Sequence, residues 1–164
     1  MQRFKTAGAA QPVTGDPVAG ERIYNRLGCA SCHAIQGAGG IYGPDLSRLG
    51  AARSSAYIRE SIVQPSADIP PEWEGVRVRT KDGRTITGVR LNEDTFTHQL
   101  RDAAGRFPVF DKLELARWEI LAYSLMPAYN KLPPQDLDHL LAYLDSLRFE
   151  ISARGPAQKA KGIH

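Results

Sequence analysis

The sequence has only two cysteines, Cys29 and Cys32, which lie three positions apart. Two thiols do not complete a four-sulfur zinc or iron–sulfur site. A pair this close along the chain also builds no structural disulfide framework. Three interpretations of the segment Cys-Ala-Ser-Cys-His, which ends at His33, therefore stay open: a thiol–disulfide redox pair, half of a metal site that other residues complete, and a covalent haem attachment site.

Long apolar runs and runs of basic residues are also missing. No segment approaches the roughly 20 apolar residues that span a bilayer, so we expect no transmembrane segment. The 21 Lys and Arg residues against 18 Asp and Glu leave a net charge of only +3, and they form no basic run, so we expect no nucleic-acid partner. With 164 residues, 42% of them hydrophobic, the chain is long enough for one domain with a real core.

The two ends differ in composition from the rest. Residues 1–15 are rich in Ala, Gly, Thr and Gln, which predicts a flexible lead-in, and they lack the apolar core of a secretory signal. Residues 151–164 read as a flexible basic tail. We therefore place the domain at residues 16–150.

Three segments have helical periodicity. Asp16 and Pro17 begin the first, with a capping residue before a proline at the first helical position, and Gly28 ends it directly before Cys29. The second is expected to run from a Ser54 cap to Gln64. The third begins at Pro134 and carries a leucine face.

Between the second and third helices the apolar pattern changes to period two. Residues 76–80 and 85–91 alternate apolar and polar side chains around an Asp-Gly pair, which indicates a hairpin. Further strands are expected at 95–100 and 107–110, whereas 112–125 fits helix and strand equally well. The predicted fold is therefore mainly α, with a small antiparallel β insertion at about residues 75–111.

Haem attachment explains the cysteine motif best. Two thiols separated by two residues span the two vinyl groups on one edge of a porphyrin, and the adjacent His33 then lies where its imidazole binds the iron. A thioredoxin-like pair would follow a strand and open a helix. Here the pair follows a helix and precedes a glycine-rich loop, so we favour one covalently bound haem c with its iron.

A low-spin haem needs a sixth ligand, usually methionine or histidine. Apart from Met1, the chain has one methionine, Met126, and Pro127 stiffens the segment that carries it. An isolated methionine is often only core filler, but its place before the last helix favours it as the ligand. The competing histidines are His98, expected on a solvated strand face, His139, expected to be exposed on the last helix, and the terminal His164.

The glycine-rich loop of residues 37–43 lacks the spacing and the preceding strand of a phosphate-binding loop. We expect its glycines to let the backbone pass close to a flat ligand. The following Pro44 offers a rigid carbonyl that would orient the His33 ring.

With these residues, the chain resembles a monohaem class I c-type cytochrome, more narrowly the haem-binding domains often joined to propeller-type dehydrogenases. The resemblance covers about residues 16–149. It implies thioethers at Cys29 and Cys32 and iron ligation by His33 and Met126. It further implies a haem pocket lined by Ile41, Tyr42, Leu46 and Leu125. His33 and Met126 are 93 positions apart, and the β insertion occupies much of that interval. The haem edge that is exposed in compact family members would therefore be partly covered in this chain.

The resemblance implies a periplasmic or otherwise exported electron carrier rather than an enzyme. Its partners would be a dehydrogenase that donates electrons and an oxidase or cytochrome that accepts them. Two alternatives stay open: a peroxidase or ligand-sensing haem protein with a displaceable sixth ligand, and an electron-accepting subunit of a larger dehydrogenase.

Overall fold

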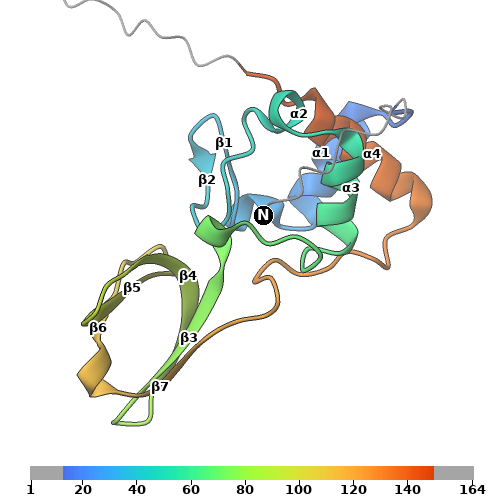
Figure 1. Cartoon of the computed structure of the whole chain (residues 1–164). Helices are drawn as coiled ribbons and strands as arrows, with labels where there is room; N and C mark the ends of the chain where they lie inside the picture. Colours follow the sequence, from blue (N-terminus) through green and yellow to red (C-terminus); the bar gives the residue numbers. More distant parts are fainter. Residues whose placement is uncertain (1–12, 150–164) are drawn as a thin grey trace, which may run out of the picture.

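The computed structural model describes residues 13–149, in which a group of helices lies beside a curled antiparallel sheet (Figure 1). The α-helices are α1 (Pro17–Arg26), α2 (Leu49–Ala52), α3 (Ser55–Val63) and α4 (Pro134–Ser146). The sheet contains β3 (Gly75–Thr80), β4 (Thr85–Glu93), β5 (Thr97–Asp102), β6 (Val109–Asp111) and β7 (Leu115–Ile120). Short elements complete the described chain: the 3-10 turns η1 (Cys29–Ser31), η2 (Pro71–Trp73) and η3 (Lys112–Glu114), and a small hairpin of β1 (Ala34–Ile35) and β2 (Ala38–Gly39).

Local sequence signals set the helix ends. The Asp16 carboxylate accepts a hydrogen bond from the Val18 amide at the start of α1, and Ser54 caps α3 in the same way through the Tyr57 amide. Gly28 ends α1 in the left-handed region at φ +71°, a conformation that glycine adopts without strain. The three helices expected from periodicity are therefore present, and α2 is an additional single turn.

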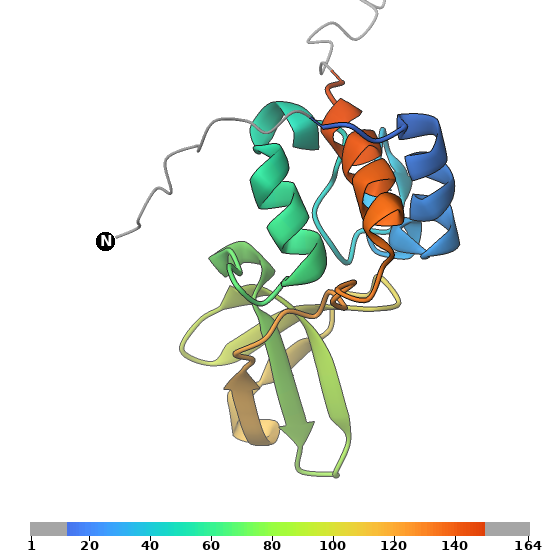
Figure 2. The ribbon, with the colours of Figure 1, turned by 90° about the vertical axis from the view of Figure 1, so that its right-hand side faces the viewer.

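One hydrophobic core joins the helices. α4 packs between α1 and α3 (Figure 2), and the approach to α1 is close: a Cβ on Gly20 would lie 2.0 Å from the His139 carbonyl oxygen. The leucine face of α4 supplies four of the ten buried residues of this core, and Leu147, directly after the helix, adds a fifth leucine. Its buried members are Ile23, Tyr24, Leu46, Ile58, Ile62, Leu137, Leu140, Leu141, Leu144 and Leu147.

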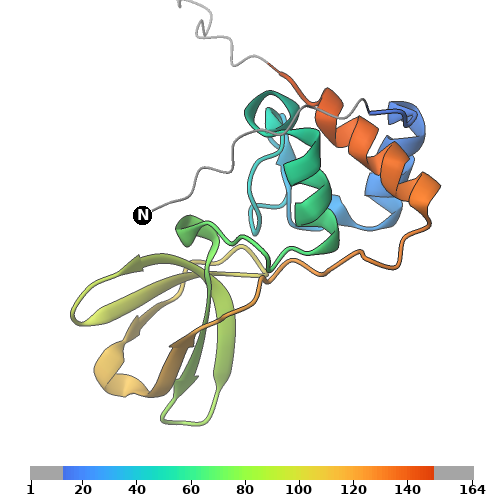
Figure 3. The ribbon, with the colours of Figure 1, turned by 45° about the vertical axis from the view of Figure 1, so that its right-hand side comes forward.

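The sheet has the strand order β6-β5-β4-β3-β7, with every neighbouring pair antiparallel. Bulges interrupt the β3–β7 and β4–β5 registers, and the strands curl around a small second core (Figure 3). That core consists of Val76, Val78, Leu100 and Leu115, with Ile86 and Phe110 against it.

The chain enters and leaves the sheet at one place. The Leu121 amide donates to the Gly75 carbonyl oxygen at 2.8 Å, beside the paired residues Val76 and Ile120. The sheet is thus an insertion whose two ends adjoin, placed between α3 and the segment that carries Met126.

The expectation of a mainly α fold is wrong, because the described chain is about 33% helix and 25% strand. The segment that fits either period, after residue 112, forms the strand β7 and pairs with β3 along its length. This pairing turns the expected small insertion into a five-stranded sheet with its own buried core.

Candidate functional site

A cavity of about 500 Å³ lies between the helices and the sheet. Its wall is mostly apolar and comes from the whole chain: α1 and η1, the loop of residues 42–46, α3, the segment around Met126, and α4. Trp73 of η2 and Val89 of β4 close it on the sheet side. A volume of this size suits a small-molecule ligand or cofactor.

Cys29 and Cys32 both line this cavity, on the turn η1 that follows the α1 end. Both thiols are free and half-buried. Burial raises the pKa of the Cys29 thiol, which disfavours the thiolate that a redox-active pair needs. The pair also stands after a helix rather than at a helix N-terminus, so the geometry argues against a thiol–disulfide redox site.

His33 lies in the cavity wall directly beyond the cysteines and is buried. Its Nδ1 is 2.8 Å from the Pro44 carbonyl oxygen. A carbonyl only accepts, so Nδ1 carries the proton and Nε2 is left with a free lone pair. Burial lowers the pKa of His33, while the hydrogen bond to Pro44 opposes that shift. The ring is therefore a neutral imidazole, the form that binds a metal.

The loop before Pro44 is fastened to the backbone of the cysteine motif. Gly40 donates to the Ala30 carbonyl oxygen at 2.8 Å and Gly43 to that of Cys32 at 2.7 Å. A Cβ on Gly43 would lie 2.5 Å from Cε1 of His33, so only glycine lets the loop pass this close to the ring. Since these amides are already used, they are not free to bind a phosphate.

Met126 lies on the wall of the same cavity and is half-buried. Its amide donates to Ser124 Oγ at 3.1 Å, and the Ser124 amide donates to Ser66 Oγ at 3.0 Å. A third hydrogen bond joins the Tyr129 amide to the Ile62 carbonyl oxygen at 3.0 Å. These contacts tie the segment to α3 and to the turn after it, and thereby bring Met126 to the cavity that contains His33.

Of the other five predicted pocket residues, four line the cavity and one does not. Tyr42, Pro44, Leu46 and Leu125 line the cavity. Ile41 is not among its lining residues: the side chain is 47% exposed, and its carbonyl oxygen accepts a hydrogen bond from Arg101 on β5.

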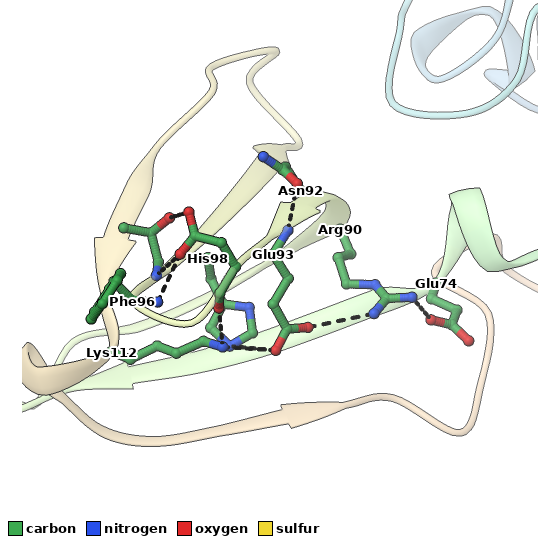
Figure 4. Close-up of polar contacts among 9 residues, drawn as sticks. Glu74, Arg90, Asn92, Glu93, Phe96, His98 and Lys112 are labelled. Atoms are coloured by element: carbon green, nitrogen blue, oxygen red, sulfur yellow. Dashed lines mark hydrogen bonds and ion pairs between the residues drawn. The ribbon is translucent and has the colours of Figure 1, made fainter.

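The competing histidines lie elsewhere. His139 is half-buried rather than exposed, and its Nδ1 accepts the Asp16 amide at the start of α1. His98 is not on a solvated strand face: it is 0% exposed inside the curled sheet, near Glu93 and Lys112 (Figure 4). His164 lies outside the described residues.

Several wall residues were not identified from the sequence. Ile58 and Ile62 line the cavity from α3, and Leu140 and Leu144 line it from α4; their helical spacing marks them as buried, but not as facing a ligand. The side chains of Tyr57, Trp73, Val89 and Tyr129 also face the cavity. Trp73 and Val89 had no sequence signal at all, because only the folding of the sheet back over the helices brings them there.

The donor set fits a haem. Two free thiols, a neutral imidazole and a thioether share one cavity with apolar walls, as a covalently attached porphyrin with two axial ligands requires. Across residues 13–149, no cluster of three His, Cys, Asp or Glu side chains is arranged to hold a metal ion.

Residues 17–95 match the family model described as Cytochrome c. The matched segment contains the cysteine motif, His33 and Pro44, and it ends before Met126. The match supports a c-type cytochrome, a family whose haem is covalently bound, whose role is generally electron transfer and whose members are typically exported. No curated protein matches the chain. Among the described helices, none is both long and apolar enough to cross a membrane.

Proposed function

We propose that this chain, whose residues 17–95 match the Cytochrome c family, is a one-electron carrier with one covalently held haem and with His33 and Met126 as its axial ligands. The observation that carries the proposal is that the thiols of Cys29 and Cys32, the His33 ring and Met126 all line one apolar cavity. The family match supports the first three of these positions, and the cavity supports the fourth.

The chain's own residues have distinct roles in this proposal. The thiols of Cys29 and Cys32 hold the porphyrin edge, and Pro44 keeps the proton on Nδ1 of His33 so that Nε2 is the ligand atom. Met126 offers a soft, uncharged thioether that favours ferrous iron and raises the potential. The bound haem would supply a reversible one-electron couple, and the apolar wall limits water around it.

We further propose a periplasmic or otherwise exported location and electron transfer from a dehydrogenase through this protein to an oxidase or another cytochrome. A thioether ligand raises the reduction potential, which suits an acceptor of electrons from substrate oxidation. Domains of this kind are often joined to propeller-type dehydrogenases, and the resemblance to them motivates this choice of donor.

The test is expression in a host with an intact c-type maturation system. Denaturing mass spectrometry should give the polypeptide plus one haem, and reduced and oxidised visible spectra should both be low-spin. The double variant Cys29→Ala/Cys32→Ala is the matched control and should release any haem on denaturation. Bare polypeptide from the wild type would overturn the proposal.

Carbon monoxide separates the electron carrier from a peroxidase or a ligand sensor. A ferrous protein whose sixth site is closed by Met126 should not bind carbon monoxide readily at neutral pH. Ready binding would instead support the displaceable-ligand alternative. Co-elution with a dehydrogenase in gel filtration would support the role as an electron-accepting subunit.

A further inference from the structure

Arg101 of β5 lies where the sheet meets the haem-attachment loop. It pairs across the strands with Val89 of β4, and side chains of a directly opposed pair lie on the same face of a sheet. Val89 is buried and lines the cavity, so this face of β4 and β5 is turned toward the helices and the cavity.

Two aromatic rings lie within cation–π distance of the Arg101 guanidinium. Its central carbon is 5.6 Å from the ring centroid of Trp73 and 5.9 Å from that of Phe107, both within the range of cation–π attraction. Trp73 also lines the cavity. Both contacts favour the present position of the guanidinium, and its planar group loses little entropy when it forms a hydrogen bond.

From this position Arg101 donates a hydrogen bond to the Ile41 carbonyl oxygen, 60 positions away in the chain. Ile41 is the first residue of the short segment 41–44. Within this segment the Gly43 amide donates to the Cys32 carbonyl oxygen, and the Pro44 carbonyl oxygen accepts from His33 Nδ1. The other hydrogen bonds of this segment are made to the cysteine motif and to His33. The hydrogen bond from Arg101 to Ile41 connects this segment to the sheet.

We propose that Arg101 is a positioning residue for His33: in contact with the Trp73 and Phe107 rings, it fixes the loop of residues 41–44 and thereby the orientation of the imidazole and the closure of the cavity by the sheet. This inference rests on the proposed function, because it concerns the same axial histidine. It also gives the β insertion a role, since the sheet then supports the haem site directly.

The test compares Arg101→Gln and Arg101→Lys with Arg106→Gln in the haem-loaded protein. Arg106 is a matched control because it follows the same strand, is 78% exposed in its side chain and pairs with Asp102 rather than with the loop. Arg101→Gln should lower the reduction potential, shift the paramagnetic NMR resonances of the His33 ring and speed hydrogen exchange of the Gly43 amide about tenfold. Arg101→Lys keeps the charge but not the planar group, so it should restore these properties only in part.

Arg106→Gln should leave all three readouts at their wild-type values. If Arg101→Gln reduces the free energy of unfolding but leaves the potential and the His33 resonances unchanged, Arg101 is only a structural tie and the inference is wrong. Failure of the proposed function is a separate result, seen as absence of covalent haem in the wild type. In that event, unchanged exchange of the Gly43 amide in Arg101→Gln would still overturn the inference.

Discussion

Two histidines, His33 and His98, are buried in this protein, and their surroundings differ. His33 has a partner for Nδ1 in the Pro44 carbonyl oxygen, and its free Nε2 lone pair suits a metal ion. Neither ring nitrogen of His98 has a hydrogen-bond partner. The charged group that faces His98 most closely is the Glu93 carboxylate, with Oε1 3.8 Å from Nε2, whereas His33 presents a free lone pair to the cavity.

At Met126, truncation should open the sixth coordination site. Met126→Ala should bind carbon monoxide and cyanide and lose the far-red charge-transfer band of ferric methionine-ligated haem. Met126→His should keep a closed low-spin site with a potential lower by on the order of 0.2 V, a fraction of the roughly 0.8 V that axial ligands span. Visible spectroscopy and redox titration measure both effects.

A neighbouring truncation, Leu125→Ala, serves as the control for Met126, since it also removes part of the cavity wall but no candidate ligand. It should keep the charge-transfer band. If Met126→Ala keeps the band and the potential while a change at His98 or His139 alters them, the sixth ligand is a histidine.

At His98, we expect a pH dependence of stability. Burial lowers the pKa of His98, with Glu93 opposing the shift and the Lys112 and Arg90 charges adding to it. The unfolded chain, with a pKa near about 6.5, then binds more protons than the folded chain. The free energy of unfolding should therefore fall as the pH drops from about 6.5 toward the folded-state pKa.

The variant His98→Phe isolates this effect, because a phenyl ring keeps the edge contact with Trp118, 4.3 Å away between ring centroids, and removes the titrating group. Denaturant unfolding at several pH values should show a flatter profile for the variant between about pH 6.5 and 5. Glu93, whose pKa is lowered mainly by its hydrogen bond with Lys112, is protonated only at more acidic pH. Identical profiles for both proteins would show that His98 is not the group that titrates.

At the scale of elements, the capping residue Asp16 connects α1 to α4 through hydrogen bonds. The Asp16 carboxylate accepts the Val18 amide at 2.9 Å, and the Asp16 amide donates to Nδ1 of His139 on α4. Asp16→Ala should reduce the free energy of unfolding by about 0.5–2 kcal/mol, measured by denaturant titration of the haem-loaded protein. Asp16→Asn keeps the accepting oxygen and should lose much less; an equal loss would assign the effect to charge instead.

The strand β7 shows where local pattern stops being informative. Residues 115–120 carry apolar side chains that fit period two and period 3.6 equally, and Trp118 and Ile120 remain partly exposed in the strand. What decides the conformation is the backbone pairing with β3, a long-range contact that local propensity does not contain.

At the scale of the whole molecule, we expect the core of the helices to fold without the core of the sheet. Gly75 and Leu121 are already hydrogen-bonded at 2.8 Å, so residues 76–120 are replaceable by a short glycine linker. The shortened protein should keep the core around α4 and attach haem at Cys29 and Cys32. It should have a lower potential and faster reaction with external ligands, because Val89 no longer closes the cavity and solvent reaches the haem.

Circular dichroism, mass spectrometry and redox titration of the shortened protein measure these properties, and a version with a longer linker controls for strain at the junction. If both linker versions match the wild type in potential and in ligand binding, the sheet has no influence on the haem. Loss of covalent haem in both versions would show instead that attachment itself depends on the sheet.

The sequence by itself determined the helix boundaries at Asp16, Ser54 and Pro134, the hairpin around the Asp-Gly pair, and the assignment of Cys29, Cys32 and His33 to one motif. Each of these depends on residues within a few positions of one another, where capping, turn geometry and thiol spacing act directly. Only the tertiary structure placed Met126 in the same cavity as His33, added β7 to the sheet, buried His98 and brought Arg101 to Ile41. These are contacts between segments far apart in the chain, and they follow from how the sheet folds against the helices rather than from any local pattern.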